Sequence, residues 1–210
     1  MGSQATTHQP WGLPLRSRLV IALVAALIVG AKFYLRMPIR VPGHSGIFWM
    51  GLLLTGAGIV GRRGGGTLIG LISGVLATFM LPGKEGVFVG VKYLVPGIAV
   101  DVLTPLLGGR LDRYPVAMLV AGVAHMGKLT ASYLIGLALG IPAGYLALGL
   151  GMASVSHVFF GMAGGAAAAF VLKRMRREGM MHVPAAAASD TGPTGMLSEK
   201  RTAAPAEELR

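Results

Sequence analysis

Cysteine is absent from the 210-residue sequence, and acidic residues are scarce, with 8 aspartates and glutamates against 19 lysines and arginines. The absence of cysteine excludes disulfides, thiolate metal sites and thiolate nucleophiles. Charged residues of both signs make up 13% of the chain, whereas a surface that faces water normally needs about a quarter. A soluble globular protein is therefore a poor interpretation of this composition.

Apolar residues and glycine are abundant instead. Hydrophobic residues make up 53% of the chain, glycine occurs 33 times, and the mean hydropathy is +0.67. Apolar windows recur along the sequence, each close to the ~20 residues that a helix needs to cross ~30 Å of hydrocarbon. Because these windows lack the alternation of a membrane β-barrel, they predict an all-α membrane protein.

Six windows predict transmembrane helices. They cover about residues 18–35, 44–61, 66–81, 86–108, 115–140 and 143–172. The short "IPAG" link between the last two windows predicts an antiparallel helical hairpin. We expect a six-helix transmembrane domain at 16–177, a flexible N-terminal arm at 1–15, and a disordered cytoplasmic tail at 178–210, which is poor in large apolar side chains.

The placement of the basic residues predicts the topology of a chain whose net charge is +11. With both termini cytoplasmic, the inner segments hold most of the basic residues near the membrane. The outer loops then hold only Lys32, Arg36, Arg40 and Lys84. This asymmetry satisfies the positive-inside rule, and the short loops suit a cell inner (plasma) membrane. Since no basic face is interleaved with aromatic residues, we expect no nucleic acid among the partners.

Ionisable residues nevertheless occur within the windows: Lys92, Asp101, His125, Lys128 and His157. Each costs at least ~2.5–3.5 kcal/mol at such depth, so each needs a partner or a wet cavity. At 1.5 Å per residue, Lys92 and Lys128 lie ~25 Å and ~21 Å above the inner ends of their helices, toward the outer side. Asp101 and His125 lie deeper, at ~12 Å and ~16 Å, and could meet if their helices are neighbours.

His125 and Lys128 stand three residues apart, with Ser132 four further along, and so form one polar stripe. The stripe is either the wall of a polar pocket or an interhelical contact that satisfies Asp101. We interpret Asp101 as a structural counter-ion. Lys92 either lines the pocket or snorkels to the outer interface.

Two further features suggest a site. Pro96 removes a backbone hydrogen bond, so we expect its helix to kink or open near residues 95–97, and broken helices often mark sites. The first outer loop, with Pro38 and Pro42 ahead of Trp49, is either a lid or an interfacial anchor. His157 is either a core histidine or a functional one. The candidate substrate-binding residues are Trp49, His44, Lys92, Tyr93, His125, Lys128, Ser132 and His157.

Catalytic motifs are incomplete in this sequence. His44, His125 and His157 fit no metal-ligand motif. The "GHSG" at 43–46 lacks the second glycine of a nucleophile elbow, because Ile47 stands there. The "GRRGGG" at 61–66 lacks the Lys-Ser/Thr end of a nucleotide-binding loop. We therefore expect no enzyme, no metal and no cofactor.

The predicted first helix carries Ala22, Ala26 and Gly30, one small residue every four positions on one face. In lipid, small residues at this spacing let two helices approach closely. The face serves either packing within the chain or the docking of a partner.

These features resemble the substrate-binding S components of energy-coupling factor (ECF) transporters, over about residues 18–177. The likeness consists of six helices with both ends inside, the small-residue face on the first helix, a lid-like first outer loop, and polar groups in the last three helices. The resemblance implies that a vitamin-like micronutrient binds near the outer side. It also implies that a transmembrane coupling protein docks on the first helix and that separate ATPases drive release inward.

Lys92 and Lys128 at one level motivate the hypothesis that the ligand carries a carboxylate or phosphate. Two other classes of protein stay open. One is a structural or assembly membrane protein whose polar residues only hold helices together, and the other is a self-sufficient small secondary transporter. The lack of a detectable internal repeat counts against the secondary transporter.

Overall fold

The computed structural model describes residues 13–34, 42–80 and 86–180, and every regular element within these ranges is helical. The predicted all-α fold is therefore confirmed. The predicted flexible arm (1–15) and disordered tail (178–210) fall almost entirely outside the described residues, as does much of the first outer loop.

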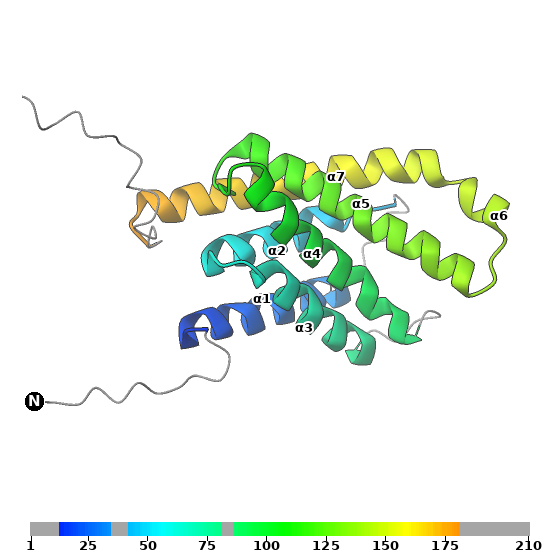
Figure 1. Ribbon diagram of the computed structural model, residues 1–210, viewed down its shortest axis with the longest axis horizontal. Coiled ribbons are helices and arrows are strands. Elements are labelled where there is room, and N and C mark those ends of the chain that lie inside the picture. Colours follow the sequence, from blue (N-terminus) through cyan, green and yellow to red (C-terminus); the bar gives the residue numbers. More distant parts are fainter. Residues whose placement is uncertain (1–12, 35–41, 81–85, 181–210) are drawn as a thin grey trace, which may run out of the picture.

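The described residues form a bundle of helices (Figure 1). In chain order they are α1 (Leu15–Tyr34), α2 (Gly46–Val60), α3 (Gly65–Met80), the 3-10 helix η1 (Gly86–Gly90), α4 (Val91–Leu106), α5 (Tyr114–Ala138), α6 (Ala143–Ala147) and α7 (Leu150–Arg177). In Figure 1 the short α6 joins α5 and α7 at one end of the bundle. The window predicted at 143–172 is thus two elements, because the chain leaves the helix at Leu148 and Gly149.

Three of these segments are long and apolar enough to cross a membrane: η1 with α4 (21 residues), α5 (25 residues) and α7 (28 residues). α2 and α3 are apolar but shorter, with 15 and 16 residues. Large apolar side chains also point outward, among them Leu23 (61% exposed), Phe79 (81%) and Leu134 (58%). So many exposed large apolar side chains suit hydrocarbon better than water. The predicted membrane character is therefore supported.

α4 runs as one helix from Val91 to Leu106, with Pro96 inside it. The alternative that Pro96 opens the helix near residues 95–97 is therefore wrong, whereas a kink there stays a prediction. Pro96 and Gly97 are buried, and Gly97 lies directly against the backbone of α3. Packing against this neighbour holds the α4 backbone helical where the proline alone would weaken it.

Glycines let the helices approach closely at two crossings. On α3, Gly66 lies against Gly97 of α4, and a Cβ on Gly70 would come within 2.6 Å of the Tyr93 carbonyl oxygen. On α7, a Cβ on Gly161 would come within 2.8 Å of the Ala121 carbonyl oxygen of α5. Both pairs are antiparallel, and the α5–α7 pair has the arrangement that the short link predicted.

The described ends of the chain lie at the same end of the bundle. Arg16, in the first turn of α1, donates a hydrogen bond from Nη2 to the carbonyl oxygen of Met180 at 3.2 Å. Beside them Asp112, in the turn before α5, accepts from Arg110 Nη2 at 2.9 Å and from Arg176 Nη1 at 2.7 Å. We call this the basic end. Asp112 ties its α4–α5 turn to the last helix.

Replacing Gly97 by Ala should destabilise the protein, because the new Cβ would lie 2.5 Å from the carbonyl oxygen of Gly66. Neither backbone can rotate away, so we expect a loss of about 1–3 kcal/mol despite the better helix propensity of alanine. Thermal unfolding in detergent measures the change. Gly151→Ala is the matched control, since a Cβ there meets no atom within 4 Å. An equal loss in the control would contradict the steric explanation.

Asp112 should give the stability a pH dependence. The hydrogen bond from Arg110 is the main cause that lowers the pKa of Asp112 from 3.8 to about 2, and Arg176 adds to it. Because the folded pKa is depressed, the stabilisation is complete above about pH 4 to 5 and is lost as the pH falls toward 2. The melting temperature of the wild type should therefore fall more steeply across this window than that of Asp112→Asn. Parallel curves for the two proteins would refute this role.

Candidate functional site

Side chains from four helices meet in a buried group that we call the aromatic–histidine cluster: Trp49 of α2, Tyr93 of α4, His125 of α5 and His157 of α7. The ring centroids of Trp49 and His125 are 5.2 Å apart, those of His125 and His157 4.6 Å, and those of Trp49 and Tyr93 5.9 Å. Each pair meets edge to face, the geometry that aromatic quadrupoles favour. The cluster forms because each helix presents one ring at the same height.

Two lysines flank this cluster. Nζ of Lys128 lies 4.7 Å from the centroid of the Trp49 ring and 6.0 Å from that of Tyr93. Nζ of Lys32, near the end of α1, lies 5.2 Å from the centroid of Tyr93. Aromatic faces stabilise a partly desolvated ammonium by about 0.5–2 kcal/mol. The cluster therefore has two ammonium groups at its edge.

Several polar atoms of the cluster are buried without a hydrogen-bond partner. They are Nε1 of Trp49, the hydroxyl of Tyr93, and both ring nitrogens of His125. The three residues are 4%, 2% and 0% exposed. A buried polar group without a partner costs about 1–3 kcal/mol, and native proteins retain few such groups. These atoms converge from three helices, which makes the cluster a candidate binding site.

The turn that precedes α2 and the first residue of α2, Gly46, cover the two histidines. Gly43 has a φ of +79°, and a Cβ on it would come within 2.9 Å of Nδ1 of His157. Gly46 packs directly against the ring of His125, with no space for a Cβ. His157 in turn has its Nδ1 2.8 Å from the carbonyl oxygen of Ala153. The first outer loop, predicted to be either a lid or an interfacial anchor, thus has its described part over the cluster, while residues 35–41 lie outside the described ranges.

The structure brings five of the eight predicted binding residues together in one place. Trp49, Tyr93, His125, Lys128 and His157 all belong to the cluster or touch it. These side chains come from α2, α4, α5 and α7, so the site is broader than the last three helices alone.

The other three predicted residues lie on α5, in the turn before α2 and on α4. Ser132 donates a hydrogen bond to the Lys128 carbonyl oxygen at 2.9 Å, within α5. His44 is half-buried in the covering turn. Lys92 is half-buried on α4, and because it precedes Tyr93 it points about 100° around the helix from that ring.

Lys32 is the residue that sequence analysis missed, because its charge was counted with those of the outer loops although it lies inside the predicted window 18–35. In the structure Lys32 belongs to α1, which ends at Tyr34. The signal was present in the spacing of the buried side chains Ile21, Val24 and Ile28. Continuing that stripe by four residues reaches Lys32, which therefore faces inward.

Asp101 does not contact His125, contrary to the pairing that equal depth suggested. Its carboxylate accepts hydrogen bonds from the backbone N–H groups of Gly66 and Thr67, at 3.0 and 2.6 Å, and from the Thr67 hydroxyl at 2.6 Å. The first N–H groups of a helix lack partners within it and attract negative charge. Asp101 thus caps α3 from a neighbouring helix, which is a structural role with a different partner.

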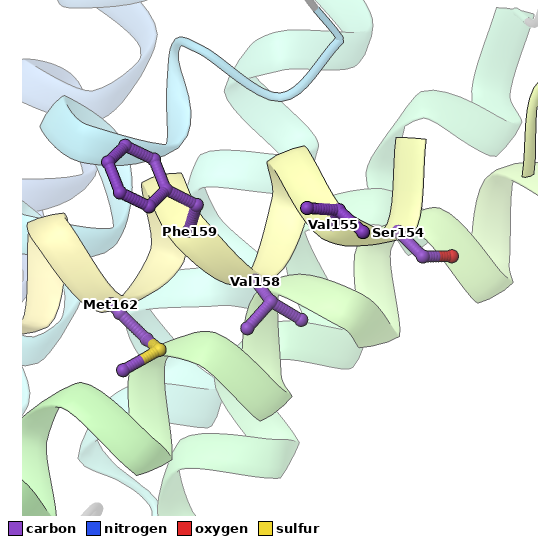
Figure 2. A pocket seen from close by; sticks show the side chains of 5 residues that line it. All are labelled: Ser154, Val155, Val158, Phe159 and Met162. Atoms are coloured by element: carbon purple, nitrogen blue, oxygen red, sulfur yellow. The ribbon is translucent and has the colours of Figure 1, made fainter. Parts of the chain in front are cut away.

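An apolar hollow of about 410 Å³ lies on the outer face of α7. Figure 2 shows its lining side chains, all from this one helix: Ser154, Val155, Val158, Phe159 and Met162. Val155 and Phe159 are 69% and 65% exposed. None of these residues belongs to the predicted site, and a surface of this chemistry suits lipid chains.

Metal ligation finds no support in the described part of the chain, where no three His, Asp or Glu side chains are grouped closely enough to hold an ion. The chain matches no protein-family model, no curated protein and no solved structure. Any inference about the function therefore has to start from the aromatic–histidine cluster.

Substitution of His125 tests whether this side chain contributes to the stability of the fold. His125→Leu removes two buried nitrogens without partners at similar volume, so we expect stability to stay equal or to rise by about 1 kcal/mol. Asp101→Leu should instead cost about 2–4 kcal/mol, because it strips three hydrogen bonds from the start of α3. Thermal melts of the purified proteins compare them. A larger loss for His125→Leu than for Asp101→Leu would show that His125 is a structural residue.

Proposed function

We propose that the chain is the substrate-binding membrane subunit of a micronutrient uptake transporter, similar to the S components of ECF transporters. It captures its ligand at the outer side of a cell inner (plasma) membrane. It releases the ligand inward together with a separate transmembrane coupling protein and separate ATPases. The subunit itself carries out no covalent chemistry.

The proposal includes six membrane crossings, by α1 to α5 and α7, with both termini cytoplasmic. Two observations support it. The described ends meet at the basic end, through Arg16 and Met180, and basic residues near the membrane favour the cytoplasmic side. α2 and α3, at 15 and 16 residues, reach about 23 Å, and a bilayer can thin locally to match such short helices.

The buried polar atoms of the cluster are the observation that carries this proposal. Trp49, Tyr93 and His125 together offer an indole donor, a phenol hydroxyl, and one donor and one acceptor on the imidazole. Trp49 and Tyr93 lie in the opening turns of α2 and α4, away from the basic end, so the site would open outward. This is the side on which an uptake protein meets its ligand.

Charge indicates the chemical class of the ligand. Lys32 and Lys128 both approach the Tyr93 ring, at 5.2 and 6.0 Å from its centroid, and Asp101, the only acid in the candidate spans, is bonded to α3. A small molecule with a carboxylate or phosphate, and a flat part that stacks on the rings, would complement these groups.

The outer face of α1 supports docking of a coupling protein. Ala22 and Ala26 are exposed, and a Cβ added at Gly30 would meet no atom within 4 Å. Leu23 and Leu27, between them in sequence, are 61% and 47% exposed. Ala22, Ala26 and Gly30 are therefore not used in close packing within the described bundle, and a second transmembrane helix could approach closely there.

The full chain, purified in mild detergent from its own membranes, should retain a small anionic molecule that native mass spectrometry identifies. Lys32→Met/Lys128→Met should weaken its binding at least about tenfold, because the anionic group loses both cations. Lys92→Met removes one charge from the residue that precedes Tyr93 in α4, and it should weaken binding less than the double variant does. Unchanged affinity in the double variant, with normal melting, would refute the anionic-ligand hypothesis.

The same purification tests the function as a whole. A substrate-binding subunit should also co-purify with a coupling protein and ATPases, and Gly30→Leu should abolish that capture while the ligand is still retained. A structural or assembly protein should retain neither ligand nor ATPases, and that result would overturn the proposal.

A further inference from the structure

A second hollow, of about 340 Å³, lies at the basic end, where α5 begins and α7 ends. It shares no residue with the aromatic–histidine cluster. Its lining residues are Tyr114, Phe170, Lys173, Arg174, Arg177 and Glu178. They combine aromatic and cationic side chains at the point where a candidate membrane span ends.

The hollow carries a net positive charge. Phe170, Lys173, Arg174 and Arg177 follow one another at i, i+3, i+4 and i+7, so they share one face of α7. Arg174 is engaged by Glu178, whose carboxylate accepts a hydrogen bond from Nε at 2.9 Å. Three cations and one carboxylate leave a net charge of +2, which comes from Lys173 and Arg177.

The aromatic residues show which side of the hollow is cationic and which side is apolar. Nζ of Lys173 lies 5.5 Å from the centroid of the Tyr114 ring, which holds the ammonium at the mouth of the hollow. Phe170 is 58% exposed and lies about one turn nearer the middle of α7. The hollow is therefore cationic toward the end of the bundle and apolar toward its middle, like the boundary between headgroups and acyl chains.

We propose that this hollow binds the headgroup phosphate of an anionic phospholipid. The guanidinium of Arg177 and the ammonium of Lys173 hold the phosphate oxygens, a geometry in which arginine can donate two parallel hydrogen bonds. Phe170 contacts the first part of an acyl chain. A lipid fits better than free phosphate because the cationic side chains lie on the same face of α7 as Phe170, an exposed apolar side chain on a candidate span.

Native mass spectrometry of the full chain in detergent tests this proposal by titration with phosphatidylglycerol, phosphatidylcholine or inorganic phosphate. Phosphatidylglycerol should bind at least about tenfold more tightly than phosphatidylcholine. Lys173→Gln/Arg177→Gln should reduce its affinity roughly 30-fold. The matched control, Arg62→Gln/Arg63→Gln, removes two exposed cations from the α2–α3 turn and should change the affinity less than about twofold.

Three results would overturn the proposal. Equal losses in the two double variants would show general surface attraction and no defined site. Equal affinity for phosphatidylcholine and phosphatidylglycerol would show that the charge of the headgroup does not determine binding. Inorganic phosphate that competes at the affinity of the lipid would assign the hollow to free phosphate. Lys173→Arg/Arg177→Lys keeps both charges and should bind phosphatidylglycerol within about threefold of the wild type, which separates loss of charge from misfolding.

Discussion

Hydrocarbon offers no hydrogen bonds, and this constraint decides where the polar groups of the described bundle lie. Asp101 is satisfied by the start of α3, while Ser132 and Ser156 donate to carbonyl oxygens of their own helices. Outward positions are filled by side chains such as Leu23 and Phe159. The buried hydroxyl of Ser73 has no partner either, and the aromatic–histidine cluster departs furthest from this pattern, because several of its polar atoms are buried and unbonded. Under the proposed function, ligand binding offsets the cost of this departure.

Close packing through glycine is the second consequence of the hydrocarbon environment. Lipid supplies no hydrophobic force between helices, so association depends on close contact between backbones. Gly97 on α4 and Gly161 on α7 are used in this way, since neither has space for a Cβ. Gly30 on α1 differs, because nothing in the described bundle lies against it. The same residue type therefore serves internal packing on α4 and α7 and leaves an open face on α1.

The two ends of the bundle differ in chemistry. The basic end has arginines held by acidic partners, as Asp112 holds Arg110 and Arg176, and its hollow has the composition of a headgroup site. The opposite end has buried rings flanked by lysines and covered by the turn at Gly43 and Gly46. An asymmetric membrane protein with one face toward substrate and the other toward anionic lipid would need such a separation.

The sequence by itself determined the helical membrane character, the positions of the longest helices, and most of the side chains that form the cluster. These properties are local. A continuous run of apolar residues defines a span, and an ionisable residue within such a run is energetically costly, which marks it as a candidate for a site. The spacing of three residues also grouped His125 and Lys128 correctly, since both side chains lie against the Trp49 ring. The height count instead paired His125 with Asp101. Height along a helix does not define direction around it. Only the tertiary structure decided that Lys32 and not Lys92 approaches Tyr93, and that Asp101 caps α3, because these choices depend on how each helix is rotated against its neighbours.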